Sequence, residues 1–436
     1  MRISVIGCGY LGAVHAACMA RLGHDVLGVD VDRNRIAALK EHRPPFYEPG
    51  FEELLAEVAD SGRLRFTSEP QIIDLGAVDV HFIAVGTPQG PTGAADLSYV
   101  ESAIESILPA LRLNPGALVV GKSTVPVGTA SRLADKVEAA GGRLVWNPEF
   151  LREGFAIEDT LRPDRIVYGV SPDPHHAGEG QRVLDEVYLD LLVAGIPRLV
   201  TDYATAELVK VAANSFLATK ISFINAMAEV CEAAGGDVTA LAEAIGYDVR
   251  IGKQFLKAGV GFGGGCLPKD IRAFVARSEE LGVSGLAFLK EVDRINQARR
   301  DRVVELATAT LGEDLAGARI AVLGASFKPR SDDIRDSPAL EVAARLQRAG
   351  ASVTITDPKA LPAVRSRWPE LNAVDSIDEA LRDADLVLVL TEWDEYRELD
   401  PTALEQVRRR IVIDGRNCLE PAVWRAAGWD YTGLGR

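Results

Sequence analysis

The sequence predicts an α/β protein in which two Rossmann-like, doubly wound parallel sheets are joined by a long central helix and a helical middle domain. Three observations support this prediction. Short β-branched strands alternate with helical stretches over the first 200 residues, a proline-free helical run follows, and strands return after Gly317. Such alternation is typical of a parallel sheet covered by helices on both faces. The sequence of the segment that begins at Arg319 is also similar to that of the segment that begins at Arg2, which indicates two related halves.

The elements are justified in chain order by their residue types. The first strands are expected where β-branched and apolar residues cluster, at 3–6, 25–29, 80–85, 118–120, 144–146 and 166–170. An alanine-rich run predicts one helix from about 204 to 234, because Gly235 and Gly236 are a stop signal. Helical patterns continue to Gly317, interrupted by a glycine-rich stretch at 259–265. The later strands are expected at 320–323, 353–356, 386–390 and 411–413.

Composition excludes several classes of protein. The longest apolar runs, such as 386–390, are too short to cross a membrane, and the amino terminus lacks signal-peptide features, so a cytoplasmic location is expected. With 48 Lys and Arg against 63 Asp and Glu, the net charge of −15 disfavours nucleic acid and anionic membranes as partners. The five cysteines are scattered without a CxxC pair, which is typical of reduced thiols. His15 and Cys18 lack further ligands nearby, so no metal site is expected.

A glycine fingerprint follows the first predicted strand. Gly7 permits a tight turn, Gly9 lets the backbone approach a pyrophosphate, and Gly12 allows helix and strand to pack closely. Asp30 ends the next strand, where a carboxylate binds ribose hydroxyls and repels a 2′-phosphate. A bare tight turn is the alternative, but strand, helix and terminal acid together predict a site for NAD rather than NADP.

The glycine-rich stretch ends at a cysteine. Cys266 follows five glycines in seven residues and stands near an expected helix start, where backbone amides and Lys269 would stabilise a thiolate. Asp270 would share its helical face if the helix has begun there. The alternative is an inert buried cysteine in a flexible loop.

Two further places carry candidate chemistry. Lys210 and Asn214 are four apart on the long helix, so they share one face and could stabilise an oxyanion, although Lys210 could merely pair with Glu207. The segment 147–154 puts Glu149 and Glu153 at helical spacing after a proline. These carboxylates could be general acid–base groups or an ordinary acidic first turn.

Taken together and in this order, the motifs resemble the family of UDP-glucose/GDP-mannose dehydrogenases along essentially the whole chain. The motifs are GxGYxG, KSTVPVGT at 122–129, NPEFLREG, the Lys210 helix, FGGGCLPKD and KPRSDDIRDSP at 328–338. The chain departs from the common family pattern at Gly265, where serine is usual. Leu267-Pro268 occurs in UDP-glucose and GDP-mannose enzymes alike, whereas 250–252 and 255–257 lean toward UDP-glucose.

The resemblance implies a four-electron oxidation in which a sugar C6 alcohol becomes an aldehyde and then a carboxylate, with two NAD consumed. It implies that Cys266 attacks the aldehyde and that the resulting thioester is cleaved by water. The other catalytic groups it implies are Lys210 and Asn214 for the oxyanions, Asp270 with Thr124 for the alcohol proton, and Glu149 for acid–base work.

Contacts with the cofactor and the substrate are also implied by the resemblance. Those with NAD are Gly7, Gly9, Tyr10, Leu11, Gly12, Asp30, Arg35, Thr87, Thr124, Glu153, Lys269 and Arg335. Those with the sugar nucleotide are Glu149, Phe150, Leu151, Lys210, Asn214, Arg250, Phe255, Leu256, Lys257, Phe262, Gly263, Lys328 and Arg416. Arg250 would come from a neighbouring subunit, so a homodimer or a higher homo-oligomer is expected, with the long helix as the core of the dimer. The expected domains are 1–200 for NAD, 201–311 for dimerisation and catalysis, and 312–436 for the sugar nucleotide.

Three alternatives remain open at this stage. GDP-mannose or another UDP-sugar could be the substrate of the same cysteine mechanism. A two-electron hydroxyacid dehydrogenase of similar layout would need no nucleophilic cysteine. A non-catalytic nucleotide-sugar sensor would have no reason to keep Cys266, Lys210, Asn214 and Asp270 together.

Overall fold

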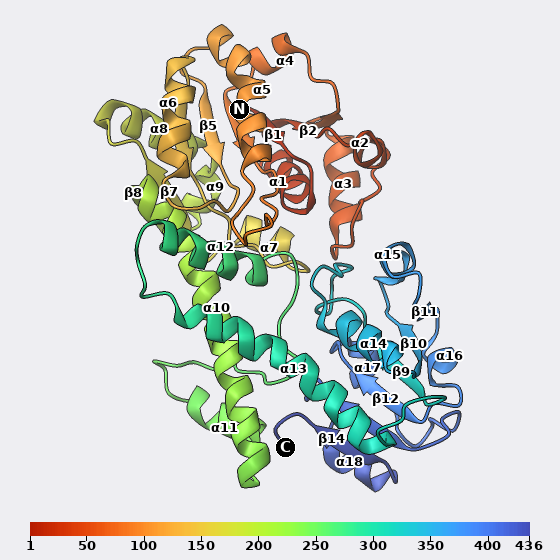
Figure 1. The fold of residues 1–436 in the computed structure, drawn as a ribbon. Coiled ribbons are helices and arrows are strands. Elements are labelled where there is room, and N and C mark those ends of the chain that lie inside the picture. The colour runs from red at the N-terminus through yellow and green to blue at the C-terminus, as the bar shows by residue number, and fades with distance from the viewer. The chain divides into compact units, whose positions relative to one another are not determined.

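The computed structural model describes residues 1–436, which divide into two units. The first unit contains Met1–Ala213 and Ala276–Gly282, and the second contains Asn214–Val275 and Val283–Arg436. Each unit is built on its own sheet (Figure 1). No helix in either unit has both the length and the apolar character that crossing a bilayer requires.

The sheet of the first unit has eight strands in the order β3-β2-β1-β4-β5-β6-β7-β8. Its first six strands follow the order of the dinucleotide-binding fold, which leaves a crevice at the carboxyl ends of β1 and β4. The strands are β1 (Arg2–Ile6), β2 (Asp25–Val29), β3 (Leu64–Thr67), β4 (Val80–Ile83), β5 (Leu118–Gly121), β6 (Arg143–Trp146), β7 (Ile166–Val170) and β8 (Arg198–Asp202).

Strand residues alternate between two cores, one on each face of this sheet. Phe82 belongs to one core and its neighbour Ile83 to the other, because successive side chains of a strand point to opposite faces. The helices that supply the rest of both cores, or connect the strands, are α1 (Tyr10–Arg21), α2 (Arg33–Lys40), α3 (Phe51–Asp60), α4 (Ile72–Gly76), α5 (Ser98–Leu113), α6 (Thr129–Ala139), α7 (Ala156–Leu161), α8 (Pro174–Val187) and α9 (Leu189–Val193).

The expectation of an all-parallel first sheet is wrong at one place. β7 pairs with β6 antiparallel through Trp146 and Gly169, whereas β7 and β8 are parallel to each other. Between β6 and β7 the chain makes an irregular loop and the short helix α7, which contacts α1, and it returns in the opposite direction. The short strands β3 and β8 escaped prediction because neither has a sustained apolar pattern; β8 is largely exposed.

The second unit carries a six-stranded parallel sheet in the order β11-β10-β9-β12-β13-β14. This order repeats that of the first six strands of the other sheet, so the prediction of two Rossmann-like halves is confirmed. The strands are β9 (Arg319–Leu323), β10 (Ser352–Thr356), β11 (Asn372–Ala373), β12 (Leu386–Val389), β13 (Ile411–Asp414) and β14 (Asp430–Gly433). The helices around them are α14 (Pro338–Arg348), α15 (Leu361–Arg367), α16 (Ile377–Leu381), α17 (Asp394–Arg397) and α18 (Pro421–Ala426).

The remaining helices include the long one that the sequence predicts. α10 (Tyr203–Ala234) has 32 residues and ends before Gly235, whose positive φ of 74° stops the helix. The others are α11 (Val238–Gly246), α12 (Leu267–Glu280) and α13 (Phe288–Leu311). Within the second unit α13 crosses the carboxyl half of α10, where Ser222 Oγ donates to Val292 O at 2.7 Å and Arg302 pairs with Glu232 at 2.8 Å (Figure 1).

Candidate active site

The glycine fingerprint of the first unit is shaped for close approach of a ligand. Gly7 has a φ of +95°, and a Cβ on Gly12 would lie 1.8 Å from the carbonyl oxygen of Gly7, so neither position admits a side chain. Beside Gly9 the space where a Cβ would lie is open. Gly9 is the N-cap of α1, whose unpaired amides and dipole favour an anion. The loop therefore fits the pyrophosphate of a dinucleotide.

Asp30 ties this loop to the end of β2. Its carboxylate accepts hydrogen bonds from Cys8 N at 2.7 Å, from Asp32 N at 2.9 Å and from the Arg35 guanidinium at 2.9 Å. The side chain is buried. Asp30 and Arg35, both predicted to bind NAD, thus lie in contact just after β2.

The second sheet has a corresponding buried acid. Asp357 follows β10 and accepts hydrogen bonds from Ala325 N and Ser326 N of the loop after β9, as Asp30 does from Cys8. Trp393 Nε1 also donates to it at 3.2 Å, and the carboxylate is 3% exposed. The second Rossmann-like half therefore repeats the contact between the acid after its second strand and the loop after its first, and here an indole N–H also binds the acid.

Glu149 and Lys210 form a largely buried ion pair in the first unit. Their carboxylate and ammonium are 2.8 Å apart, and the side chains are only 12% and 6% exposed. The Lys210 ammonium also lies 5.7 Å from the centre of the Phe150 ring. Of the two alternatives for this segment, an ordinary acidic first turn is not found, because 147–155 is a loop and α7 begins only at Ala156. A carboxylate oxygen of Glu149 accepts from Leu151 N at 2.6 Å, which holds the loop in this form.

The alternative pairing of Lys210 with Glu207 is not found. Glu207 instead accepts hydrogen bonds from Gly128 N at 2.7 Å and Ala130 N at 2.6 Å, so it caps the start of α6. Burial raises the pKa of Glu207 to about 7 although these amides oppose the shift. Nearby in the same unit, Thr87 Oγ1 donates to Thr124 O at 2.8 Å, which brings together two predicted contacts of NAD.

Sequence reasoning missed Glu48, which links the cofactor loop to the loop after β6. Tyr10 OH donates to the Glu48 carboxylate. Gly154 N donates to the Tyr10 hydroxyl oxygen at 2.8 Å and to Glu48 Oε2 at 2.6 Å. Glu48 also accepts from Ala156 N at 2.8 Å, and burial raises its pKa. It escaped notice because it stands in an irregular segment that has neither a motif nor a period.

Cys266 lies in the second unit, immediately before α12, and is exposed. Asp270 N donates to Cys266 O at 3.0 Å, so the helix has begun as predicted and the two residues share its first turn. The Asp270 carboxylate is buried, where it accepts from Asn214 Nδ2 at 2.7 Å and from Lys269 Nζ at 2.6 Å. A thiol, a carboxylate, an amide and an ammonium group are thus gathered around one helix start.

The other cysteines have a different environment. Burial raises the pKa of Cys8 and Cys418 far above the ordinary thiol range and that of Cys18 to about 12. Cys231 is buried within the apolar core formed by α10 and α11. Since a thiolate is the reactive form, Cys266 is the one cysteine placed to act as a nucleophile.

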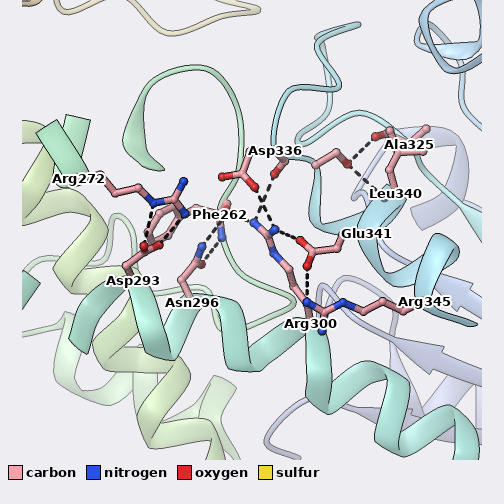
Figure 2. Close-up of polar contacts among 11 residues, drawn as sticks. Phe262, Arg272, Asp293, Asn296, Arg300, Ala325, Asp336, Leu340, Glu341 and Arg345 are labelled. Atoms are coloured by element: carbon pink, nitrogen blue, oxygen red, sulfur yellow. Dashed lines mark hydrogen bonds and ion pairs between the residues drawn. The ribbon is translucent and has the colours of Figure 1, made fainter. Parts of the chain in front are cut away.

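Three side chains of α13 hold the glycine-rich loop that precedes Cys266. Asn296 Oδ1 accepts from Phe262 N at 2.8 Å, and Asn296 Nδ2 donates to Phe262 O at 2.9 Å (Figure 2). This pair of hydrogen bonds fixes the loop backbone. Arg299 donates to Gly259 O. The buried Arg300 bridges Phe262 O, Asp336 and Glu341 of α14 (Figure 2). Their spacing along one buried helix face was the available sequence signal.

The same loop packs directly on the segment 333–338. A Cβ on Gly263 would lie 2.2 Å from Asp336 O, and one on Gly265 would lie 2.3 Å from the guanidinium carbon of Arg335. The departure from the family's usual serine at position 265 therefore coincides with a site where the guanidinium fills the space. The two motifs, distant in sequence, form one packed surface within the second unit.

The substitution Asn296→Ala is expected to loosen this loop. It would leave the buried N–H of Phe262 without an acceptor, and the C=O would keep only the longer hydrogen bond from Arg300 at 3.4 Å, at a cost of about 2 kcal/mol in the free energy of unfolding. Urea unfolding measures this loss. The exposed amide of Asn372, which donates to Thr354 Oγ1, provides the control Asn372→Ala, whose midpoint should remain near that of the wild type. Equal effects of the two substitutions would contradict the role given to Asn296.

Several of the residues predicted to bind the cofactor or the sugar nucleotide lie in the second unit, and their environments there differ. Arg416 donates to the carbonyl oxygens of Leu390, Gly261 and Phe327, so its guanidinium also holds the glycine-rich loop. Arg335 pairs with Asp333, Lys328 lies over the Phe327 ring, and Arg250 pairs with Asp248 while 86% exposed. Phe255 has a positive φ of 63°, Leu256 is buried and Lys257 is exposed. Their contacts with a ligand remain predictions.

The dinucleotide loop of the first unit and the thiol of the second define the class of dinucleotide-dependent oxidoreductases. Three sequence profiles of the UDP-glucose/GDP-mannose dehydrogenase family match the chain. The profile of the NAD binding domain matches residues 1–192, that of the central domain 204–298 and that of the UDP binding domain 321–421. The chain therefore belongs to the UDP-glucose/GDP-mannose dehydrogenase family, and its cofactor is NAD.

Similar proteins span the whole chain. The UDP-glucose 6-dehydrogenase of Rhizobium meliloti (strain 1021) is 42% identical over 442 residues, all of both chains, and UDP-glucose 6-dehydrogenase TuaD of Bacillus subtilis (strain 168) is 39% identical over all of this chain and 93% of its own. A UDP-glucose dehydrogenase structure from Pyrobaculum islandicum has a TM-score of 0.90 at 40% identity, covering 100% of this chain and 97% of its own. A GDP-mannose dehydrogenase structure from Pseudomonas aeruginosa has a TM-score of 0.54 at 29% identity, with both chains fully covered.

Proposed function

We propose that this enzyme oxidises the C6 alcohol of UDP-glucose to the carboxylate of UDP-glucuronate. The observation that carries the proposal is full-length identity of about 40% to proteins named UDP-glucose 6-dehydrogenase. The UDP binding domain profile favours a uridine nucleotide. The alternative substrates, GDP-mannose or another UDP-sugar, would use the same chemistry.

Bound NAD supplies the hydride acceptor for each of two oxidations. The first removes a hydride from C6 and a proton from the hydroxyl, which leaves an aldehyde. The Cys266 thiolate then adds to the aldehyde carbon, and loss of the second hydride from this thiohemiacetal yields a thioester. Water attacks the acyl carbon, the C–S bond breaks, and the carboxylate leaves while the thiol is restored. One water and two NAD are consumed for each sugar.

The catalytic role proposed for each residue is based on the contacts of its side chain. Asp270, which accepts from Asn214 and Lys269, would receive the alcohol proton with the help of Thr124. Lys210 and Asn214 would stabilise the oxyanions, and Glu149, paired with Lys210, would move protons during thioester formation and hydrolysis.

A homodimer is part of the proposal. Within the second unit, α10 exposes Phe216, Phe223 and Val230, which recur every seven residues on one side of the helix. Such an apolar seam suits self-association of two long helices. Arg250, which is exposed, would then serve the partner's sugar nucleotide. A cytoplasmic location is proposed because the cysteines are all unpaired.

The proposal is tested by the number of NADH formed from a limiting amount of each sugar nucleotide. UDP-glucose should yield two NADH for each molecule consumed and should end as UDP-glucuronate. GDP-mannose and UDP-N-acetylmannosamine, assayed in parallel, should react far more slowly. One NADH from UDP-glucose would indicate a simple two-electron dehydrogenase, and faster turnover of another sugar nucleotide would reassign the substrate.

A further inference from the structure

Glu48 is a buried carboxylate whose hydrogen-bond donors are neutral groups. Only 5% of the residue is exposed. Gly154 N donates to Glu48 Oε2 at 2.6 Å, and Ala156 N donates to Oε1 at 2.8 Å. The Tyr10 hydroxyl also donates to Oε2. A buried carboxylate is costly unless hydrogen bonds replace its hydration, so each of these contacts is needed to keep the charge inside the first unit.

One role of this carboxylate is to cap α7. The helix begins at Ala156, and its N-cap residue, Phe155, supplies no side-chain hydrogen bond to the helix. Glu48 Oε1 therefore accepts from the first amide of the helix in place of an ordinary cap. This role uses only one oxygen of the carboxylate. It does not explain Oε2, whose donors, Tyr10 and Gly154, both lie outside α7.

The hydrogen bonds to Oε2 join two parts of the dinucleotide-binding fold. Tyr10 is the first residue of α1, at the turn that fits a pyrophosphate, whereas Gly154 lies in the loop after β6. In this fold the strands β1 to β3 and the strands β4 to β6 form two mononucleotide-binding halves. Since Asp30 after β2 assigns the adenosine to the first half, the loop after β6 belongs to the half that takes the nicotinamide nucleotide.

Packing and backbone conformation both favour this link. The Tyr10 ring lies 4.7 Å from the ring of Phe46, which in turn stacks on Phe51 of α3 at 5.3 Å, so the direction of the hydroxyl is fixed. On the other side, Gly154 has a positive φ of 80°, which residues with a side chain rarely adopt. Its amide also donates to the Tyr10 hydroxyl oxygen at 2.8 Å. Tyr10, Glu48 and Gly154 thus form a closed triangle of hydrogen bonds.

We propose that Glu48 is a positioning residue for NAD. Through Oε2 it holds the loop after β6 against the first turn of α1, and so keeps the nicotinamide half of the site in register with the pyrophosphate turn. Glu48 acts through Tyr10 and Gly154 and does not itself touch the cofactor in this scheme. The inference requires only that NAD is the cofactor, and it holds for whichever sugar nucleotide is oxidised.

The test compares the binding of NADH and of ADP to Glu48→Gln and Tyr10→Phe. NADH, followed by its fluorescence, needs both halves of the site, whereas ADP, measured by calorimetry, needs only the adenosine half and the pyrophosphate turn. Glutamine has one acceptor oxygen, so its amide would face a backbone N–H, and phenylalanine lacks the hydroxyl. Both variants should raise the Kd for NADH about tenfold, whereas the Kd for ADP should change by less than about twofold.

The melting temperature separates the two roles of the carboxylate. Glu48→Gln should melt several degrees lower than the wild type because it disturbs the cap of α7, whereas Tyr10→Phe leaves that cap in place and should melt near the wild type. Asp173→Ala is the matched control, because the Asp173 side chain caps α8 of the same unit by accepting from two backbone amides. It should lower the melting temperature and leave the Kd for NADH unchanged.

A double variant shows whether the two side chains act as one unit. If the Tyr10 hydroxyl acts through Glu48, the double variant should bind NADH no more weakly than Glu48→Gln alone. Multiplied effects would mean that Tyr10 acts on the cofactor separately, and they would overturn the inference. An equal loss of affinity for ADP would also overturn it, because that loss would indicate a loosened domain.

Unchanged NADH binding in a Glu48→Gln variant that merely melts at a lower temperature would leave the carboxylate with its capping role alone. Should Glu48→Gln fail to fold, Tyr10→Phe decides, and wild-type affinity for NADH in that variant would overturn the inference. Failure of the wild type to form two NADH from UDP-glucose would overturn the proposed function instead, and it would not affect the role of Glu48 in binding NADH.

Discussion

Replacing Cys266 with serine is expected to reduce the release of UDP-glucuronate by at least about 10³-fold, because a hydroxyl is a far weaker nucleophile than a thiolate. The first oxidation does not need the sulfur, so a single slow NADH per active site should still form. Product analysis by chromatography, together with NADH absorbance in a single-turnover experiment, measures both effects. The substitution is small, so the melting temperature should change little.

Cys418→Ser is the matched control. The Cys418 thiol lies beside Asp414, and burial raises its pKa far above the ordinary range, so it holds its proton and should not react. This variant should form two NADH from each UDP-glucose, as the wild type does. If Cys266→Ser also released uronate at the wild-type rate, the thioester scheme would be wrong, and the hydroxyacid dehydrogenase alternative would regain support.

Replacing Lys210 with methionine is expected to have the second largest effect. The Glu149 carboxylate, 12% exposed, would lose a partner at 2.8 Å and remain buried with an uncompensated charge, which costs about 3 kcal/mol of the free energy of unfolding. Loss of a cation that stabilises the oxyanions should also reduce kcat by about 10²- to 10³-fold. Denaturant unfolding and steady-state kinetics measure the two effects separately.

A double variant separates these two consequences. Adding Glu149→Gln to Lys210→Met removes the unpaired charge, so most of the lost stability should return, whereas activity should not. Lys40→Met, at the exposed end of α2, controls for the loss of a lysine as such. Recovery of activity together with stability in the double variant would mean that Lys210 serves the fold alone.

Local signals account for most of what sequence reasoning predicted correctly. The glycine fingerprint, the acid after β2 and the stop of α10 at Gly235 each depend on backbone conformations that neighbouring residues impose. The start of α12 beside Cys266 was also predictable from local sequence, because a helix cap and a first turn involve only a few consecutive residues. The repeated strand order likewise follows from the alternation of strands and helices, apart from the reversed β7.

Where the sequence left alternatives open, a distant segment decided the outcome. The loop carrying Glu149 carries a helical pattern, yet it stays irregular because Glu149 pairs with Lys210 of α10 and Glu48 holds Gly154. Spacing alone allowed Lys210 to pair with Glu207 one turn away, but Glu207 caps α6 instead. Competition between a neighbour on the helix and partners from other elements cannot be read from spacing.

The sequence by itself determined which chemistry the chain carries: a dinucleotide loop, a thiol at a helix start, and the ordered motifs of one family. Only the tertiary structure decided how those groups are held. The pair of hydrogen bonds between Asn296 and Phe262 joins residues far apart in the chain, and so does the buried hydrogen bond from Lys122 to Asn147. Burial and pairing are properties of the packed molecule, and they set the charge and geometry of each side chain.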